Sequence, residues 1–455
     1  MNKIPVIAIF DVGKTNKKLL LFSEQYELLQ EESRPMEEVN DEDGFPCDDV
    51  VALTSWIKES YTVLLRSERY AIKGINFSGY GASFVYLDEE GKVMLPLYNY
   101  LKPFPRPLLE SFYTKYGGEE ILASQTASPV LGSLNSGMQV YRLKEERPEV
   151  FSKVAAALHL PQYLSYTLTG ALHTDITSIG CHTNLWDFTR QHYHRWVTEE
   201  QVDGKFPAIK DCTEQAGATA DGIPVGGGLH DSSAALIPYL ASFTEPFVLL
   251  STGTWCITLN PFNAQPLTIP ELKSDCLCYL TYKGKPVKAS RLFAGNEHEQ
   301  QVKRLAAHFE KEADYYKSVK ADPLLLRKYP MDYEALKQLQ TEALPMVSVF
   351  GERDLADFGS YEEAYHLLIA DLMALQVQSS WLVMKDTSVK KIFVDGGFSK
   401  NPIYMQLLAA AFPDKEVYAA TVAQASSLGA AMAIHAIWNT QTLPSSLVQL
   451  RKYGQ

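Results

Sequence analysis

A strand that runs into a tight glycine turn occurs twice in this chain, about half a chain length apart. The first copy covers residues 5–15 and turns at Gly13, and the second covers 246–255 and turns at Gly253. The chain becomes apolar again after each turn, over 19–22 and 256–259. Each copy therefore predicts a β-hairpin with a polar tip. The repetition favours two domains built around one theme.

The tips of the two hairpins share a chemistry. Each combines glycine with threonine, together with Lys14 in the first tip and Trp255 in the second. Such a tip offers backbone N–H groups and small hydroxyls at close range, which phosphate oxygens require. Two facing tips, one in each domain, would hold a polyphosphate from both sides.

Composition narrows the class of protein. A chain of 455 residues suggests two or three domains, and a formal charge of −12 argues against a nucleic-acid partner. No continuous apolar run reaches the roughly 18 residues of a membrane span, and a strand already begins at Pro5, which leaves no signal-peptide core. The six cysteines are scattered, and Cys276 and Cys278 are too close for an easy disulfide. We expect reduced thiols in a cytoplasmic enzyme.

Local patterns predict the order of elements. A domain boundary is expected near residue 240, after a cluster of Pro224 and glycines and a helix that opens at 231–233. The first domain is expected to contain strands at 6–10, 17–22, 72–77, 83–87 and 93–98, a helix from near Asp48, and a helix that ends at Gly170. The second is expected to contain a hairpin at 246–260, strands at 286–290, 391–394 and 416–419, a long helix over 361–384, and helices from Pro402 and over 425–438.

The first tip invites comparison with a P-loop, because it reads Gly13-Lys14-Thr15. A P-loop needs glycine five residues earlier, where this chain has Ala8, and a helix after the lysine, where it has a strand. What remains is a phosphate-binding hairpin, with Asp11 at the strand end to hold hydrated Mg²⁺. An ordinary hairpin with a capping aspartate explains the same residues.

Asp231 follows three consecutive glycines, 226–228, and His230. An aspartate before a helix of small residues serves as an N-cap. The glycines also let another group approach closely, so the carboxylate could accept a proton from a substrate hydroxyl. The two roles are compatible, because the side chain has two oxygens.

Two later segments have more than one explanation. Asp395-Gly396-Gly397 joins a strand to a helix and could contact a ligand at the strand end, or it could be a plain glycine-rich connection. Residues 424–431 form a helix with a small face, for which close helix packing is the main explanation. The ten histidines show no metal-ligand spacing, and His182, His192 and His194 are expected at the surface or in local packing.

Taken in order, these segments resemble the FGGY family of carbohydrate kinases, within the actin-like ATPase superfamily, over nearly the whole chain. The segments that most resemble the L-rhamnulokinase branch, with L-fuculokinase as its near neighbour, are 160–166, 167–170, 229–234 and 251–255. The resemblance implies an α/β fold with two ribonuclease-H-like domains and a cleft between them. Residues 1–240 would bind the sugar and supply the base, and residues 241–455 would bind ATP.

The resemblance also implies roles for single residues. Asp231 would be the catalytic base, and Asp11 would hold Mg²⁺. Contacts to ATP would come from Gly13, Lys14, Thr15, Asn16, Lys17 and the neighbouring Lys18, and from Thr252, Gly253, Thr254, Gln300, Gly396 and Gly397. Contacts to the sugar would come from Gly81, His230 and Asp231.

Three departures from the family pattern affect the sugar site. Lys102 stands where an aspartate is usual, a polar contact expected near residue 292 falls on Arg291-Leu292, and Gln424 replaces a glutamate. The expected reaction is ATP-dependent phosphorylation of a hydroxyl group of a ketose such as L-rhamnulose or L-fuculose, and the hydroxyl group is expected to be a primary one. The alternatives are a kinase for another pentulose or polyol, and a non-catalytic actin-like nucleotide-binding module. The expected partner is a small sugar, with no nucleic acid and no membrane, and the protein is expected to be a monomer or homodimer.

Overall fold

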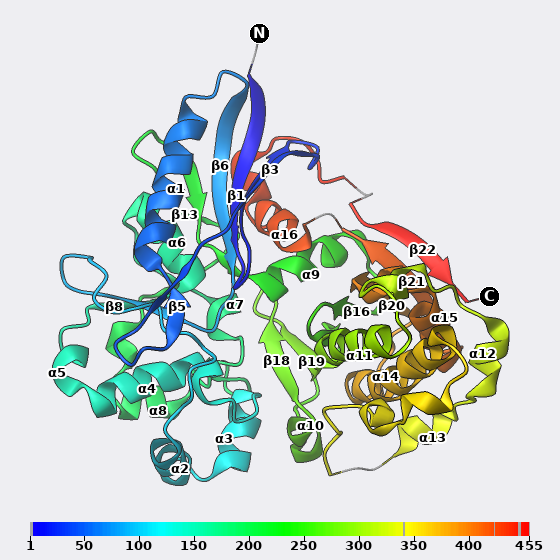
Figure 1. Ribbon diagram of the computed structural model, residues 1–455. Coiled ribbons are helices and arrows are strands. Elements are labelled where there is room, and N and C mark those ends of the chain that lie inside the picture. Colours follow the sequence, from blue (N-terminus) through cyan, green and yellow to red (C-terminus); the bar gives the residue numbers. More distant parts are fainter. Residues whose placement is uncertain (1–2, 340–341, 423, 445–446, 455) are drawn as a thin grey trace. The chain divides into compact units, whose positions relative to one another are not determined.

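The computed structural model describes residues 3–339, 342–422, 424–444 and 447–454. Its contacts divide the chain into two units (Figure 1). Unit 1 comprises Met1–Ser242, Cys278–Pro286 and Ala423–Leu447, and unit 2 comprises Phe243–Leu277, Val287–Val422 and Val448–Gln455. The first crossing lies close to the boundary expected near residue 240, and two later segments return to unit 1.

Unit 1 is built on a sheet whose strand order is β13-β14-β6-β1-β2-β3, with β15 paired to β6. Its strands are β1 (Ile4–Val12), β2 (Lys17–Ser23), β3 (Leu28–Arg34), β6 (Tyr70–Gly79), β13 (Gln215–Ala218), β14 (Pro224–Gly226) and β15 (Leu229–His230). β1 and β2 pair antiparallel up to Val12 and Lys17, which confirms the first hairpin and excludes a P-loop helix. β1 and β6 run parallel.

Helices and short strands surround this sheet. The helices are α1 (Val50–Leu65), α2 (Arg106–Lys115), α3 (Glu119–Thr126), α4 (Ser136–Glu146), α5 (Pro148–Phe151), α6 (Leu160–Thr169), α7 (Ile176–Ile179), α8 (Arg195–Glu199), α9 (Asp231–Ser242), α16 (Ala425–Ala433) and α17 (His435–Trp438). The short strands are β4 (Glu38–Asn40), β5 (Pro46–Asp48), β7 (Phe84–Leu87), β8 (Ala156–His159), β9 (Thr174–Asp175), β10 (Trp186–Asp187), β11 (His192–Tyr193) and β12 (Ile209–Lys210). Gly170 ends α6 in the left-handed conformation (φ 66°), as its sequence position predicts.

Two local predictions for unit 1 are wrong. Residues 93–98 make only isolated bridges, at Val93 and Leu97, because Pro96 has no N–H to donate to a ladder. The helix expected over 425–438 is two helices, α16 and α17, interrupted at Ile434.

Unit 2 repeats the hairpin on a sheet that includes the order β19-β17-β16-β20-β21-β22. Its strands are β16 (Phe247–Thr252), β17 (Cys256–Asn260), β18 (Cys276–Leu280, which ends in unit 1), β19 (Pro286–Leu292), β20 (Lys391–Gly396), β21 (Glu416–Thr421) and β22 (Gln449–Tyr453). β16 and β17 are antiparallel, which confirms the second hairpin, and β16 runs parallel to β20. The helices are α10 (Ile269–Lys273), α11 (Ala294–His308), α12 (Pro323–Lys328), α13 (Tyr333–Gln338), α14 (Tyr361–Met384) and α15 (Pro402–Ala411).

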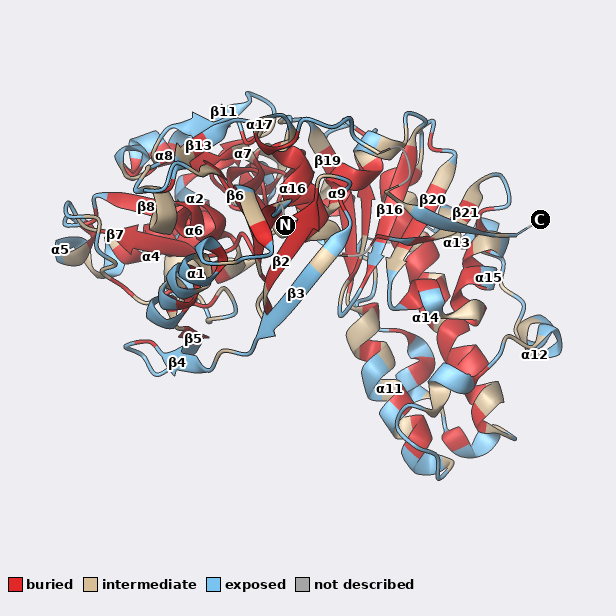
Figure 2. Ribbon diagram, turned by 90° about the horizontal axis from the view of Figure 1, so that it is seen from above, coloured by how far each residue is buried: buried red, intermediate tan, exposed pale blue. Residues whose placement is uncertain are grey.

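Helix α14 has the bounds that the sequence pattern predicts, and its setting explains its apolar character. Among the described residues it is the one helix whose length and hydropathy would allow a membrane span, a feature that the search for continuous apolar runs missed. Within its most apolar stretch, 72% of the residues are buried in the protein. Figure 2 shows buried strands at the centre of each unit, while β3 is exposed. Helix α14 is therefore typical of a core helix.

Helices α9 and α16 pack unusually closely within unit 1. A Cβ atom built on Gly429 of α16 would lie 1.8 Å from the carbonyl oxygen of Ala234 in α9. This spacing leaves room for hydrogen only, so the small face of α16 is explained by close helix packing, as predicted.

We expect Gly429→Ala to lower the free energy of unfolding by at least about 1–3 kcal/mol, because backbone atoms must move to admit the methyl group. The measurement is urea unfolding of the full chain followed by circular dichroism. Gly204→Ala is the matched control, since nothing lies within 4 Å of its Cβ position, and its effect should stay within about 0.5 kcal/mol. Equal stability of the two variants would contradict the close packing.

Candidate active site

Three strand ends meet at one edge of the unit 1 sheet. The parallel register pairs Asp11 of β1 with Ser78 of β6, and it pairs Leu229 and His230 of β15 with Ser78 and Gly79. The chain then turns directly from His230 into α9, whose first residue is Asp231. Because ligands of α/β proteins bind at the carboxyl ends of parallel strands, this edge is the candidate active site of unit 1.

Asp231 lies at the start of α9 with its side chain 35% exposed. Its Oδ1 accepts hydrogen bonds from the backbone N–H of Ser232 (2.6 Å) and from the Ser232 hydroxyl (3.2 Å). Burial of the carboxyl group raises its pKa to about 6, against the lowering effect of these bonds. The group is thus poised to take up a proton near neutral pH.

Asp11 is held by the N-terminus of α16. Its Oδ2 accepts hydrogen bonds from the hydroxyls of Ser426 (2.6 Å) and Ser427 (2.7 Å). Burial raises the pKa of Asp11, and the negative charge of Asp231 raises it further. The sequence pattern offered no signal for the two serines, which lie 415 and 416 residues from Asp11.

Gly81 and His230 are in direct contact. A Cβ atom on Gly81 would lie 2.4 Å from Cδ2 of His230, so any side chain there would displace the imidazole ring. His230 Nε2 lies 3.4 Å from Asp231 Oδ1, and burial lowers the pKa of His230 to about 3, so the ring is neutral. Its Nδ1 is buried and has no hydrogen-bond partner among the residues that the structure describes.

The backbone of His230 is anchored by residues that sequence reasoning missed. Its N–H donates to the hydroxyl of Thr177 (3.0 Å), and this hydroxyl donates to the carboxyl group of Asp175. Asp175 also caps α7 by accepting from the N–H of Thr177 (2.8 Å). A helix cap is a local signal, but its link to His230 depends on the folded chain.

The lysines of the first hairpin are engaged with carboxylates. Lys17 is 2% exposed and its Nζ contacts Asp48 at 2.6 Å, while Lys14 contacts Asp48 at 2.9 Å and Glu38 at 2.5 Å. Burial tends to raise the pKa of Asp48, but the bonds from Lys17 and Lys14 outweigh it and hold the pKa below its ordinary value. Asp48 was not anticipated from the sequence.

The rest of the first tip is arranged around one backbone bond. The N–H of Gly13 donates to the carbonyl of Asn16 (2.9 Å), which closes the turn. Thr15 and Asn16 are exposed, and Lys18 pairs with Glu31 at 2.8 Å. The second tip closes in the same way, through the N–H of Gly253 and the carbonyl of Trp255 (2.9 Å).

In unit 2 the register brings the two predicted nucleotide segments together. Thr252 pairs with Gly396 across β16 and β20, and its hydroxyl accepts from the N–H of Phe398 (3.0 Å). A Cβ atom on Gly396 (φ +88°) would lie 1.9 Å from the Thr252 carbonyl oxygen, so only glycine fits. At Gly397 the nearest atom would be 3.9 Å away.

A pocket of about 430 Å³ opens beside the tip of the second hairpin, within unit 2. Its lining includes Gly253, Thr254, Gly295, His298 and Tyr316. Gln300, the other predicted nucleotide contact, is exposed, donates to Asn296 (2.8 Å) and is not part of the lining.

The residues that depart from the family pattern have structural partners. Lys102 contacts Asp41 and Asp43 (2.5 and 2.6 Å), and Arg291 makes two hydrogen bonds to Asp275 (2.7 and 3.0 Å). Leu292 is buried. Gln424 accepts a hydrogen bond from Lys18 (3.2 Å) and donates one to Glu31 (3.0 Å).

Comparison with known proteins identifies the architecture. The family model described as FGGY family of carbohydrate kinases, N-terminal domain, matches residues 6–238, and that described as Carbohydrate kinase FGGY, C-terminal domain, matches residues 244–442. Among solved structures, a carbohydrate kinase from Novosphingobium aromaticivorans superposes with a TM-score of 0.78 at 24% identity, covering 99% of this chain and 94% of that one. A xylulose kinase from Lactobacillus acidophilus also gives 0.78, at 16% identity, covering 99% and 93%. These matches confirm the expected two-domain α/β fold.

Curated relatives match over a shorter stretch. L-fuculokinase of Escherichia coli (strain K12) is 23% identical over 287 residues, covering 56% of this chain and 57% of the relative. Rhamnulokinase of Klebsiella pneumoniae (strain 342) is 28% identical over 274 residues, covering 56% and 54%. The chain thus spans about half the length of the curated relatives it matches.

Proposed function

Because the chain belongs to the FGGY family of carbohydrate kinases, we propose that it transfers the γ-phosphoryl group of ATP to a hydroxyl group of a sugar. The observation that carries this proposal is the carboxyl group of Asp231, which stands at the strand ends of unit 1 with its pKa raised to about 6. A carboxylate with such a pKa can accept the proton of an attacking hydroxyl group.

In the proposed reaction the chain's own groups orient the acceptor and move one proton. Asp231 Oδ1 is fixed by the two hydrogen bonds from Ser232, so Oδ2 receives the hydroxyl proton. The imidazole ring of His230 lies beside this carboxyl group and is proposed to contact the sugar, and Gly81 leaves room for the ring. Positioning and electrostatics supply most of the rate in phosphoryl transfer.

The carboxyl groups of unit 1 fit a divalent cation. The negative charge of Asp231 repels that of Asp11 and raises the pKa of Asp11, and a cation between such groups would reduce this repulsion. Oxygen ligands of this kind suit Mg²⁺, which keeps several waters and needs few carboxylates, and we assign Asp11 as its ligand. When bound, Mg²⁺ neutralises charge on the phosphoryl group being transferred.

Nucleotide contacts are proposed in both units. In unit 2, Thr252–Thr254 and Gly396–Gly397 would contact ATP, because Gly253 and Thr254 line a pocket and Gly397 has open space at its Cβ position. In the first hairpin, Gly13 and the exposed Thr15 and Asn16 form the tip. Both lysines pair with Asp48, but Lys14, with 21% of its side chain exposed, is more accessible to phosphate than Lys17, whose side chain is only 3% exposed.

For the acceptor we propose a ketose such as L-rhamnulose or L-fuculose, phosphorylated on a primary hydroxyl group. Curated relatives named rhamnulokinase and L-fuculokinase support this class. The ion-paired Lys102 and the buried Leu292 stand at positions where the family has polar sugar contacts, so another pentulose or a polyol is the alternative.

A coupled assay of ADP release across L-rhamnulose, L-fuculose, L-ribulose, D-xylulose and polyols tests the proposal. We expect sugar-dependent ADP release with one of the deoxyketoses, because their acceptor carbon presents a primary hydroxyl group to Asp231. Release with another sugar alone would correct the substrate. Tight ATP binding without sugar-dependent release would favour a non-catalytic nucleotide-binding module.

We expect Asp231→Asn to lower kcat by about 10²–10⁴-fold, because an amide cannot accept the proton. The wild-type kcat should also decrease as the pH is lowered past about 6. Above its pKa, Asp231 is charged and can accept a proton, whereas below this pKa it is protonated and cannot. Steady-state kinetics between pH 5 and pH 8 measure both effects.

The control for this prediction is Asp203→Asn, which changes an exposed carboxylate on the same unit. It should keep the parental rate and pH profile. Parental kcat in Asp231→Asn, or an acid limb that is unchanged in it, would remove Asp231 from the proposed role.

Gly396 and Gly397 form a matched pair for the nucleotide site. Gly397 has helical dihedral angles (φ −64°, ψ −48°) and open space at its Cβ position, so Gly397→Ala should fold normally. Its methyl group would intrude on ATP and raise the KM for ATP roughly tenfold, equivalent to about 1.4 kcal/mol. Gly396→Ala should instead lower thermal stability, because φ is +88°.

Initial-rate kinetics and thermal melting of the two variants separate these effects. An unchanged KM for ATP in a stable Gly397→Ala protein would exclude that turn from the nucleotide site.

A further inference from the structure

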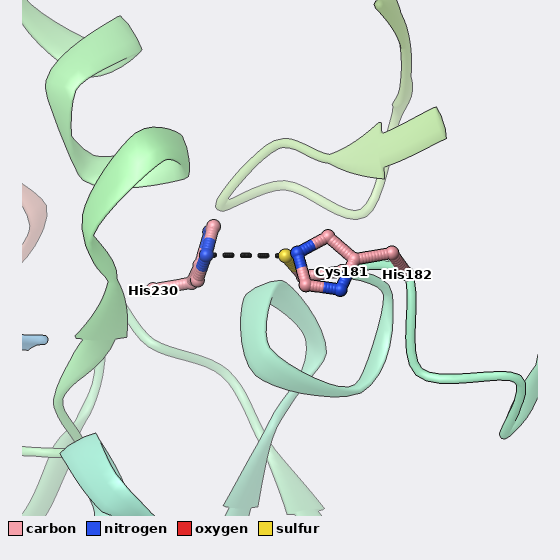
Figure 3. Close-up of side chains that lie close together, drawn as sticks. All are labelled: Cys181, His182 and His230. Atoms are coloured by element: carbon pink, nitrogen blue, oxygen red, sulfur yellow. Dashed lines mark hydrogen bonds between the residues drawn. The ribbon is translucent and has the colours of Figure 1, made fainter. Parts of the chain in front are cut away.

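Three side chains capable of binding a metal ion converge inside unit 1. Cys181 and His182 follow α7, and His230 belongs to β15 (Figure 3). The ligand atoms of the three residues lie within 4.8 Å of one another, and Cys181 Sγ is 3.1 Å from His230 Nε2. Cys181 and His230 are 49 positions apart in the sequence, which explains why sequence spacing did not indicate a metal site. His182 is buried, which agrees with local packing, one of the two settings expected for it, and not with a surface position.

The surrounding groups orient both imidazole rings. His182 Nδ1 lies 3.1 Å from the carbonyl oxygen of Leu134, so a proton on Nδ1 donates to this carbonyl and leaves the lone pair of Nε2 for a metal. Metal-binding histidines commonly use a backbone carbonyl in this way. The His230 ring stacks on Tyr279, with ring centroids 5.7 Å apart, and its backbone is anchored at Thr177.

The donor set determines which ions suit the cluster. One thiolate and two imidazoles match Zn²⁺ and similar thiophilic divalent cations, and they are poor ligands for Mg²⁺. With Zn–S near 2.3 Å and Zn–N near 2.0–2.1 Å, one sulfur and two nitrogen ligands in a tetrahedral arrangement lie about 3.3–3.6 Å apart. The observed spacing therefore requires side-chain shifts of about an ångström. Three protein ligands leave the fourth position open, which is typical of exchangeable rather than structural zinc.

We propose that Cys181, His182 and His230 bind one thiophilic divalent cation such as Zn²⁺, and that its binding inhibits the enzyme. Cys181 binds as a thiolate and releases its proton to solvent, so the cluster gains one positive charge. This charge lies beside Asp231, whose Oδ1 is 3.4 Å from His230 Nε2. The side-chain shifts that metal binding requires move the His230 ring, which is proposed to contact the sugar beside Asp231, so bound metal disturbs a sugar contact. The inhibitory effect rests on the proposed kinase function, whereas the metal site does not.

Cobalt spectroscopy tests the site directly. The full chain, treated with chelator and then kept in excess Mg²⁺, is titrated with Co²⁺ and then with Zn²⁺. We expect thiolate-to-cobalt charge-transfer absorption that saturates at one equivalent and is abolished when Zn²⁺ displaces Co²⁺. Cys181→Ala and His182→Gln should each weaken binding by more than about 100-fold, beyond the loss caused by an outer-shell change.

Cys276→Ala is the matched control, because it removes a buried cysteine of unit 2 and should keep the cobalt spectrum. Thermal melting of each variant establishes that it is folded, and Cys181→Ser replaces Cys181→Ala if the latter does not fold. Absence of a thiolate band in the wild-type protein, or a wild-type titration in Cys181→Ala, would overturn the proposal and leave the cluster as a thiol–imidazole hydrogen bond.

Kinase assays then test inhibition. We expect Zn²⁺ to lower kcat/KM for the sugar at least tenfold in the wild type and in Cys276→Ala. In Cys181→Ala, kcat/KM should be the same with and without Zn²⁺. Equal inhibition of Cys181→Ala would show that Zn²⁺ acts elsewhere and overturn the regulatory part. If no sugar is phosphorylated by the wild type, the proposed function fails while the cobalt titration still decides the metal site.

Discussion

Parallel pairing of β6 with β1 and with β15 is the constraint on which the candidate site of unit 1 depends. The register places Asp11 against Ser78 from one side, and Leu229 and His230 against Ser78 and Gly79 from the other. Asp231 follows at the next position, where α9 begins. Two carboxyl groups that are 220 positions apart in the sequence are thereby held near one another, because backbone hydrogen bonds of a sheet leave no freedom of register once its faces are buried.

This arrangement is unfavourable for folding at neutral pH. Burial raises the pKa of both Asp11 and Asp231, so the folded chain disfavours their charged forms relative to the unfolded chain. Ionisation of Asp231 therefore reduces stability as the pH rises from its ordinary pKa of 3.8 through its folded-state pKa of about 6, and ionisation of Asp11 acts in the same direction. Asp48 has the opposite effect: its pKa is lowered by Lys17 and Lys14, so its contribution to stability is present at neutral pH and is lost as the pH falls. A candidate site whose charged form is electrostatically unfavourable thus occurs in the same unit as a stabilising ion-pair network.

Local patterns in the sequence predict the elements well and their long-range partners poorly. Both hairpins, the bounds of α14 and the end of α6 at Gly170 follow from periodicity and from glycine placement. The strand expected over 93–98 fails because Pro96 outweighs the apolar pattern. Other contacts join segments that are distant in the chain, and nothing in the local sequence encodes the partner. They are the hydrogen bonds from Ser426 and Ser427 to Asp11, the Asp48–Lys17 ion pair and the Cys181–His230 contact.

The two hairpins share a backbone device but differ in the chemistry around it. Each tip is closed by one glycine N–H, to the carbonyl of Asn16 in the first and of Trp255 in the second. In the first, the adjacent lysines form ion pairs with Asp48, so their positive charges stabilise the fold in addition to any contact with a bound anion. In the second, close packing of Gly396 on Thr252 builds the turn from small groups, with open space at Gly397. A repeated hairpin can therefore keep its backbone geometry while its charged residues diverge. The proposed nucleotide contacts rest on the likeness of the two hairpins, and the proposed choice of sugar rests on the departures at Lys102 and Leu292.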